Sequence, residues 1–429
     1  MARNRTACAL CALLAVPAGC AGSQTASPIP RDAGAMLSPP VDGGFARLYD
    51  FKGAHNGALP DGALVDIKGI LYGTTSAGGV VEGSSCGGFG CGIVFKSTQS
   101  GSEQVLYRFK GGSDGSTPEG ALAATSGAFY GTTTFGGNGC SCGTVFKVTE
   151  AGAERVIYSF KGYAQNDGGN PQYNETLLAY DGNLYGTTYA GGSANLGTVY
   201  EITPSGKERV LHAFGLKPKD GANPTGKLIA YGGVLYGAAF NGGTSNEGAI
   251  FAITTSGKER IVYSFPGNYG GAGPNGVTAV NGVFYGTTTF GGSGCYSLGC
   301  GLVFGITPAG KAKVLYRFQG GANDGSHPGS GATLVTVAHH AGILYGTTDE
   351  GGCPGGSPSG LCGTVFAVST SGAENVLFEF QGFTNGFLPL TPLTSSGGML
   401  YGTTYGGGAT CPASGGSGGG CGTIFRIAP

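Results

Sequence analysis

The run Leu71-Tyr72-Gly73-Thr74-Thr75, or a close copy of it, occurs seven times along this chain of 429 residues. The tyrosines of the seven copies are Tyr72, Tyr130, Tyr185, Tyr236, Tyr285, Tyr345 and Tyr401, separated by 58, 55, 51, 49, 60 and 56 residues. Self-similarity at this period predicts an array of similar supersecondary units rather than one irregular core. The fourth copy carries Ala238 and Ala239 in place of the two threonines.

Each repeat contains four apolar runs, which we name a to d in chain order. In the first repeat, run a lies at 63–65, run b is the motif above, run c lies at 93–95 and run d at 106–109. Adjacent apolar residues in runs b and c predict strands that are covered on both faces, whereas the alternation in run d predicts an edge strand. Four-stranded blades stacked around an axis satisfy both conditions.

The runs at the two ends of the array indicate how it is completed. The array opens with a run d at 48–51 and closes with a run c at 423–427. In a ring the N-terminal strand completes the last blade, whereas an open β-helix would leave two unfinished units with bare edges. The sequence therefore favours an all-β fold over residues 45–429. This fold is a seven-bladed β-propeller of four-stranded antiparallel blades, closed by the N-terminal strand joining the last blade.

The loops between the runs fall into two classes. The a–b and c–d connections are tight turns, such as Pro204-Ser205-Gly206-Lys207, in which glycine supplies the positive φ. The b–c and d–a connections are long, and in an antiparallel blade they lie at the same end. We name this end the long-loop face and expect any functional surface to lie on it.

The order of these motifs resembles the GloVer (Gloeo/Verruco) tandem repeat family. The resemblance covers residues 45–429. The motifs that carry it occur in this order: run d, an Asp/Asn-Gly loop with proline, Leu-Tyr-Gly-Thr-Thr, Gly-Gly, Gly-Thr-Val-Phe and a Pro-Ser-Gly turn. It implies an exported bacterial surface protein whose anchoring device differs from member to member. It brings no catalytic residues to this chain.

Residues 1–20 are predicted to be a signal peptide. Two arginines precede a short apolar stretch at 7–16, which is too short to span a bilayer. The sequence ending at Cys20 resembles a bacterial lipobox, which predicts lipidation of Cys20 and contact with the membrane only through that anchor. The alternative is an ordinary secretory signal that is cut near Ala21. Residues 21–44, rich in Ala, Gly, Ser and Pro, are predicted to be a flexible tether.

Ten of the thirteen cysteines fall in pairs within the b–c loops, and the third and fourth repeats have none there. The pairs are Cys86/Cys91, Cys140/Cys142, Cys295/Cys300, Cys353/Cys362 and Cys411/Cys421. Two cysteines or none per loop predicts local disulfides in an exported chain, and we expect these disulfides to rigidify their loops. A metal site would need a recurring histidine or more cysteines nearby, and neither recurs. The sequence thus predicts no metal and no cofactor.

The d–a loops repeat an Asp or Asn followed by glycine and then proline. These residues are Asn56, Asp114, Asp167, Asp220, Asp324 and Asn385, while the fifth repeat has Gly270 at this place. Asx turns account for Asp, Asn and Gly alike. A calcium site is the alternative, but it needs several convergent oxygens, and only one carboxylate recurs per loop.

Aromatic residues in the long loops are the candidate ligand-binding residues, because rings bury area at a low entropic cost. They are Tyr163, Tyr173, Tyr269, Tyr296, Phe383 and Phe387. The alternative is that these rings pack beneath their own loops. The sixth repeat alone also carries His339-His340 and Asp349-Glu350, which are conceivable as an acid/base or metal pair.

The low charge limits the classes of partner. Charged residues make up 11% of the chain, the net charge is −1, and no basic stripe exists, so no nucleic-acid partner is predicted. No recurring catalytic motif appears. We therefore expect a monomeric, non-enzymatic cell-surface or secreted protein that binds glycan or protein. The alternatives are a secreted polysaccharide-acting enzyme that uses the central funnel and a purely structural envelope module.

Overall fold

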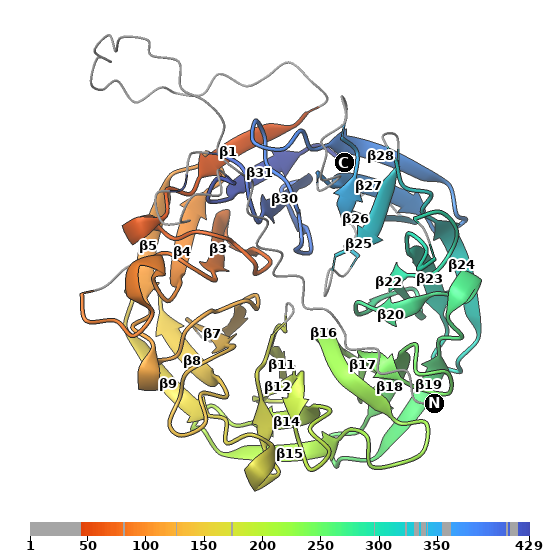
Figure 1. Ribbon diagram of the computed structural model, residues 1–429, viewed down its shortest axis with the longest axis horizontal. Coiled ribbons are helices and arrows are strands. Elements are labelled where there is room, and N and C mark those ends of the chain that lie inside the picture. The colour runs from red at the N-terminus through yellow and green to blue at the C-terminus, as the bar shows by residue number, and fades with distance from the viewer. Residues whose placement is uncertain are drawn as a thin grey trace, which may run out of the picture. The chain divides into compact units, whose positions relative to one another are not determined.

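Seven antiparallel sheets follow one another around a ring (Figure 1). The computed structural model describes residues 44–429 except 80–81, 126, 173–174, 296, 322–323, 330–333, 336–339, 341, 354–361, 409–410 and 412–418. All described residues belong to one unit, Pro40–Pro429. The predicted signal peptide, the lipidation site Cys20 and most of the predicted tether lie outside the described residues.

Each blade holds its strands in the order a, b, c, d, and in Figure 1 the d strands form the outer rim. The first three blades contain β2 (Val65–Ile67), β3 (Ile70–Thr75), β4 (Ile93–Thr98) and β5 (Glu103–Arg108); β6 (Ala123–Thr125), β7 (Ala128–Thr133), β8 (Thr144–Thr149) and β9 (Glu154–Ser159); and β11 (Leu178–Tyr180), β12 (Asn183–Thr188), β14 (Thr198–Ile202) and β15 (Glu208–Ala213). The next two contain β16 (Gly221–Tyr231), β17 (Val234–Gly242), β18 (Ala249–Ile253) and β19 (Glu259–Ser264); and β21 (Thr278–Val280), β22 (Val283–Phe290), β23 (Leu302–Ile306) and β24 (Ala312–Arg317). The last two contain β25 (Gly325–Pro328), β26 (Ile343–Gly351), β27 (Thr364–Ser369) and β28 (Glu374–Glu379); and β29 (Thr394–Ser396), β30 (Met399–Thr404), β31 (Thr423–Ile427) and β1 (Ala46–Asp50).

Short elements add to the blades at their loop ends. They are β10 (Gly168–Gly169), which pairs with β13 (Ala190–Gly191), β20 (Ala272–Pro274), which pairs with β22, and the 3₁₀ turns η1 (Ala54–Asn56), η2 (Gly87–Phe89), η3 (Gly112–Asp114), η4 (Tyr163–Gln165) and η5 (Asn268–Gly270). In the sixth blade the predicted run a forms a single bridge between Val335 and Tyr345. No described helix has the length and apolar character that crossing a bilayer requires.

The N-terminal strand closes the ring, as the order of the runs predicts. β1 pairs antiparallel with β31, with Ala46 opposite Arg426 and Asp50 opposite Thr423. The backbone N–H of Ala428 also donates to the carbonyl of Gly44 at 3.3 Å. The seventh blade is therefore assembled from both ends of the array: β31 is paired on both sides, and β1 takes the outer edge position that strand d holds in the other blades.

The glycine of the repeated motif makes room for an aromatic ring on the neighbouring strand. A Cβ at Gly73 would lie 2.7 Å from the Phe95 ring, and one at Gly131 would lie 2.5 Å from the Phe146 ring. Such distances are shorter than a carbon contact allows, so the close packing requires glycine. The ring of strand c can then lie flat across strand b in the core.

The same rings join each blade to the next. The last aromatic of run d packs edge-to-face against the strand c aromatic of the following blade, with ring centroids 5.0–5.2 Å apart. The seven pairs are Phe51/Phe95, Phe109/Phe146, Phe160/Tyr200, Phe214/Phe251, Phe265/Phe304, Phe318/Phe366 and Phe380/Phe425. Edge-to-face pairs at this spacing stabilise a core beyond the area they bury. The core of this protein therefore lies between blades.

The alanine substitution in the motif of the fourth repeat is matched by an alanine on the neighbouring strand c. In four of the other blades the last motif threonine bonds to a threonine of strand c, as Thr133 does to Thr144 at 2.8 Å. In the fourth blade Ala239 stands opposite Ala249, so both hydroxyls of the pair are absent together. Losing both partners leaves no buried hydroxyl unsatisfied.

Candidate functional site

The long b–c and d–a loops lie at the same end of the blades and bond to one another. The N–H of Gly192 in a b–c loop donates to the carbonyl of Asp167 in the preceding d–a loop at 2.8 Å. Gly243 makes the same bond to Asp220, also at 2.8 Å. These bonds join loops of consecutive repeats and confirm that a single face carries both classes of long loop.

The five local disulfides are present in the structure, including Cys140–Cys142. In three of them, Cys86–Cys91, Cys140–Cys142 and Cys295–Cys300, the sulfurs lie against the first glycine of the following d–a loop. A Cβ at Gly162 would lie 2.7 Å from the Cys142 sulfur, and one at Gly320 would lie 2.8 Å from the Cys295 sulfur. Five disulfides indicate an oxidising, extracellular environment.

The burial of these cysteines shows that the b–c loops reach into the core. In four of the five pairs the first cysteine is half-buried, but the second is buried in the core between blades; these buried residues are Cys91, Cys300, Cys362 and Cys421. Each of the four stands two residues before strand c begins, where the chain is already entering the core. Cys91, for example, packs in one cluster with Val94 and Phe109.

The buried cysteines also bond through their backbone to the next repeat. The carbonyl of Cys91 accepts the N–H of Thr117 at 2.9 Å, and that of Cys300 accepts the N–H of His327 at 2.8 Å. Free or bonded, cysteine behaves as a small apolar side chain, so its burial beside strand c follows from its chemistry. These four disulfides therefore fasten the loop to the core, besides bracing the loop itself.

The recurring Asp of the d–a loops organises its own turn. The Asp167 carboxylate accepts the backbone N–H groups of Lys161 at 2.8 Å and Gly168 at 2.6 Å. Asn385 accepts the N–H of Gln381 at 2.7 Å, so asparagine serves equally well. The predicted Asx turn would bond the side chain to the N–H two residues further on, whereas these bonds mainly run back to the start of the loop; the side chain therefore orders the loop as a whole.

A tyrosine of strand d and a glutamate of the next blade complete each of these turns. The Tyr158 hydroxyl donates to Asp167 at 2.7 Å and contacts Glu208 at 3.3 Å. We name this arrangement the interblade triad. Five interblade triads occur among the described residues: Tyr49, Asn56 and Glu103; Tyr107, Asp114 and Glu154; Tyr158, Asp167 and Glu208; His212, Asp220 and Glu259; and Tyr316, Asp324 and Glu374.

A second carboxyl group in the triad changes the protonation of the glutamate. Burial and the nearby Asp114 carboxylate together raise the pKa of Glu154 to about 7. Burial and Asp167 likewise raise the pKa of Glu208 to about 7. Each of these glutamates therefore takes up its proton near neutral pH.

At the two remaining blade junctions two members of the triad are replaced together. Where the loop has Gly270, the next blade has Ala312 at the place of the glutamate, and Tyr263 is retained. Where strand d has Phe378 instead of tyrosine, Phe45 takes the glutamate's place, and the two rings stack with centroids 3.8 Å apart, while Asn385 still accepts the N–H of Gln381. Two polar partners are thus lost together at each junction, which limits the number of unpaired buried polar groups.

An open groove of about 620 Å³ runs beside the second of these triads. Its polar lining comes from Asp114, Asn138, Glu154, Tyr158 and Lys161. It lies over the junction of the first and second blades, at the rim. This groove has the size of a small-molecule site but lacks the enclosed apolar walls that such sites usually have.

Three of the six aromatic candidates are largely exposed to solvent on the long-loop face. Tyr163 is 62% exposed, Tyr269 71% and Phe383 62%. Phe387 is half-buried, and its ring lies edge-on to Phe383 at 5.7 Å. The candidates Tyr173 and Tyr296 lie outside the described residues.

Further exposed apolar side chains on this face were not among the candidates. They are Phe89, Phe135, Leu216 and Leu298, all in b–c or d–a loops. Of the eight large apolar side chains exposed in the described part of the chain, only Tyr231 lies at the opposite end, in an a–b turn. A search for any large apolar residue in a long loop, rather than for aromatics alone, would have found the two leucines.

Acidic side chains also gather where the chain enters the innermost strands. Burial raises the pKa of Asp61 well above its usual range, and Glu119 and Asp349 raise it further.

Of the other polar residues singled out in the sixth repeat, His340 bonds through Nδ1 to the Tyr345 hydroxyl at 2.7 Å. His339 lies outside the described residues, and Glu350 pairs with His327 at 2.9 Å.

Comparisons with known proteins agree with the repeat architecture. A solved structure described as luciferin-regenerating enzyme superposes with a TM-score of 0.40 and 12% sequence identity, covering 87% of this chain and 92% of that chain. A likeness of that size carries no argument about function. No curated protein sequence matches the chain. The profile of the Gloeobacter/Verrucomicrobia repeat matches residues 25–160, 81–298 and 257–429. Because these stretches overlap across the whole array, the chain belongs to the Gloeobacter/Verrucomicrobia repeat family.

Proposed function

We propose that this protein is an exported, non-enzymatic binding protein that holds an extended, neutral polysaccharide on its long-loop face. The observation that carries the proposal is the distribution of exposed large apolar side chains. Seven of the eight in the described residues lie on that face. Exposed apolar groups gathered at one end of a fold mark an interaction surface, whereas scattered ones need no explanation.

The spacing of these side chains favours a polymer over a compact partner. Tyr163, Tyr269 and Phe383 each occupy a different d–a loop, so they stand apart around the ring. A protein interface has a contiguous apolar centre within a polar rim. Separate rings in polar, glycine-rich loops instead suit sugar units of a long chain, each stacking on one ring. Several weak contacts on one polymer then add up to strong binding.

The charge of the protein supports a neutral ligand. The chain has a net charge of −1 with 11% charged residues, so neither an anionic nor a cationic polymer would gain much long-range attraction. Sugar hydroxyls can be met by the backbone N–H and C=O groups that glycine-rich loops present. Such contacts give orientation without requiring charged side chains.

Export and anchoring complete the proposal. The disulfides of the long-loop face support an extracellular site of action. The lipobox-like sequence at Cys20 supports a lipid anchor, with residues 21–44 as the tether that carries the propeller away from the membrane.

The test is a binding screen followed by loop-face variants. Residues 45–429, purified with their disulfides, would be applied to a glycan array and to insoluble polysaccharides. Tyr163→Ala, Tyr269→Ala and Phe383→Ala should each weaken binding about tenfold, the effect of about 1.4 kcal/mol from one lost ring. Tyr231→Ala, which removes a ring from the opposite face, is the matched control. Unchanged binding in the three loop variants, together with loss of binding in Tyr231→Ala, would show that the ligand binds at the opposite end of the blades and would contradict the proposal.

One observation favours a second candidate, a polysaccharide-acting enzyme. Burial raises the pKa of Asp61 well above its usual range, and the charges of Glu119 and Asp349 add to that rise; pairs of carboxyl groups with separated pKa values carry out glycoside hydrolysis. Reducing ends released from a bound polysaccharide, and lost in Asp61→Asn with binding retained, would establish this activity. Binding without any release would leave the binding protein as the function.

A further inference from the structure

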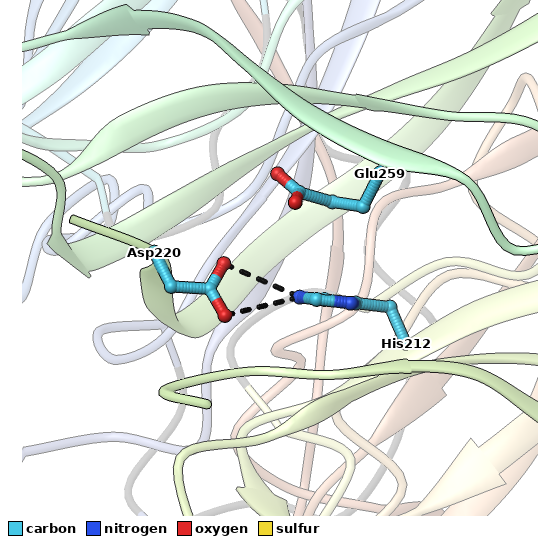
Figure 2. Close-up of side chains that lie close together, drawn as sticks. All are labelled: His212, Asp220 and Glu259. Atoms are coloured by element: carbon cyan, nitrogen blue, oxygen red, sulfur yellow. Dashed lines mark hydrogen bonds and ion pairs between the residues drawn. The ribbon is translucent and has the colours of Figure 1, made fainter. Parts of the chain in front are cut away.

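One interblade triad differs from the others in the chemistry of its donor. His212 on β15 takes the place of the tyrosine, and it faces Asp220, which immediately precedes β16, and Glu259 on β19 (Figure 2). The His212 Nε2 atom lies 3.2 Å from both oxygens of Asp220. One ring nitrogen of His212, one carboxylate oxygen of Asp220 and one of Glu259 all lie within 4.8 Å of one another. The three side chains come from two consecutive blades.

The site is largely buried and its carboxylate is held in place. The side chains of His212, Asp220 and Glu259 are 8%, 1% and 4% exposed. The N–H groups of Gly215 and Gly221 donate to the two oxygens of Asp220 at 3.0 and 2.9 Å. Such outer hydrogen bonds orient a metal-binding carboxylate and fix its position before the ion arrives.

The glutamate of this triad lacks the hydroxyl donor that a tyrosine supplies in other triads. Its Oε2 atom is 3.5 Å from the exposed ammonium of Lys217, and its Oε1 atom is buried without a hydrogen-bond partner among the described residues, as are the Oε1 atoms of the other four triad glutamates. In the Tyr158 triad the hydroxyl bridges both carboxylates, at 2.7 and 3.3 Å. The imidazole is shorter than the phenol. It therefore reaches Asp220 and leaves Glu259 without the bridging donor that a tyrosine would supply.

We propose that His212, Asp220 and Glu259 bind a divalent transition-metal ion, with Zn²⁺ as the expected ion. One imidazole and two carboxylates form a mixed nitrogen and oxygen set of the kind zinc accepts. Zinc bonds of about 2.0–2.2 Å in tetrahedral directions place ligand atoms about 3.3–3.6 Å apart. The separation of 3.2 Å between His212 and Asp220 already approaches that value, and only Glu259 has to close in. Solvent would supply the fourth ligand.

The position of the site indicates its role. The third and fourth blades are the two whose b–c loops carry no cysteine, and Leu196 and Glu247 stand where the other blades have a disulfide. A metal bound by β15, the start of β16 and β19 would cross-link these two blades. The sector without disulfides would then have a cross-link of its own.

The principal competing arrangement is an ion pair without metal. In that case His212 is protonated and bridges to Asp220 only. Burial acts to raise the pKa of Asp220, but the hydrogen bonds and charge of His212 and the N–H groups of Gly215 and Gly221 outweigh it and lower that pKa. Both arrangements use the same contacts, so only metal binding itself distinguishes them.

The experiment uses the exported chain without a histidine tag, stripped with EDTA and dialysed. We expect titration calorimetry with ZnCl₂ to give one site per chain, and mass spectrometry of the metal content to give one zinc. At zinc about 100-fold above the dissociation constant, the melting temperature should rise by about 3 °C, given the unfolding entropy of a chain of this length. Zinc content below one tenth per chain would overturn the proposal.

The variants separate this site from adventitious binding. His212→Tyr restores the triad of the other blades, so it should fold, lose the bound zinc and lose the zinc-dependent rise in melting temperature. Glu259→Gln, which keeps the side-chain size, should weaken zinc binding at least tenfold and decides the matter if His212→Tyr does not fold. His327→Ala, at a histidine paired with Glu350 elsewhere, is the matched control and should keep one zinc. Zinc retained in the first two variants, or lost in the third, would show that the ion binds elsewhere.

Discussion

A buried hydroxyl in the third blade gives the sharpest test of the core. Tyr200 occupies the strand c position that phenylalanine holds in the other six blades. Its side chain is buried, and its hydroxyl has no hydrogen-bond partner among the described residues. The ring itself keeps the edge-to-face contact with Phe160 at 5.1 Å. Tyr200→Phe therefore removes only the unsatisfied oxygen and preserves the packing.

The expected gain follows from the cost of a buried polar group that lacks a partner, about 1–3 kcal/mol. Tyr200→Phe should raise the free energy of unfolding by about 1 kcal/mol, measured by urea denaturation with the slope unchanged. The matched control is Tyr185→Phe in the same blade. Its hydroxyl donates to Glu201 at 3.0 Å, so the same chemical change there should lower the free energy of unfolding by about 1 kcal/mol. If both variants lower it equally, the Tyr200 hydroxyl has a partner and the reasoning is wrong.

Three further predictions test the triads, the closure and the repeated glycine. Burial raises the pKa of Glu154, Glu208 and Glu374 from 4.5 to about 7, so the folded state binds more protons than the unfolded state between those values. The free energy of unfolding should therefore fall as pH rises from 4.5 to 7, by about 1 kcal/mol per glutamate after solvent screening, and the triple Glu→Gln variant should flatten that slope. Deleting residues 45–51 should expose the edge of β31 and abolish the single cooperative transition, seen by calorimetry; an unchanged transition would argue against closure. Gly131→Ala should cost about 1–3 kcal/mol, because its Cβ would meet the Phe146 ring at 2.5 Å, whereas Gly182→Ala, in an open turn, should show only the smaller cost of its positive φ.

The ring and its loop face could be predicted because each repeat carries the same short-range signals. The Leu-Tyr-Gly-Thr-Thr motif fixes strand b, the Pro-Ser-Gly turns fix the c–d hairpins, and the order of runs at the two ends implies closure. Cysteines two to ten residues apart in one loop can reach only each other. The burial of the second cysteine, as at Cys91, was not predicted, because it depends on contacts with the following blade. The inferences that succeeded depend on residues within one repeat or on the order of repeats.

The interblade triads could not be predicted from the same signals. Tyr158 and Glu208 are 50 residues apart, and they meet only because strand d of one blade lies beside strand d of the next. A sequence signal existed, since the glutamate stands four residues before the run d tyrosine in several repeats, but alternation on a strand explains that spacing without any contact. The proposed metal site was missed for a related reason. The sequence argument for a metal site required a histidine that recurs from repeat to repeat, whereas His212 replaces the run d tyrosine in one repeat only.

The paired replacements within the triads have a consequence for how such arrays change and how they can be designed. Phe378 and Phe45 replace a tyrosine and a glutamate that belong to different repeats, as Gly270 and Ala312 replace an aspartate and a glutamate. The unit that varies together is thus the seam between two repeats, not the repeat itself. A designed sequence in which each repeat position is drawn independently from the residues observed there would join phenylalanine to glutamate at some seams. A designed propeller of this family should instead copy seams, by choosing the end of one repeat and the beginning of strand d in the next as a single cassette.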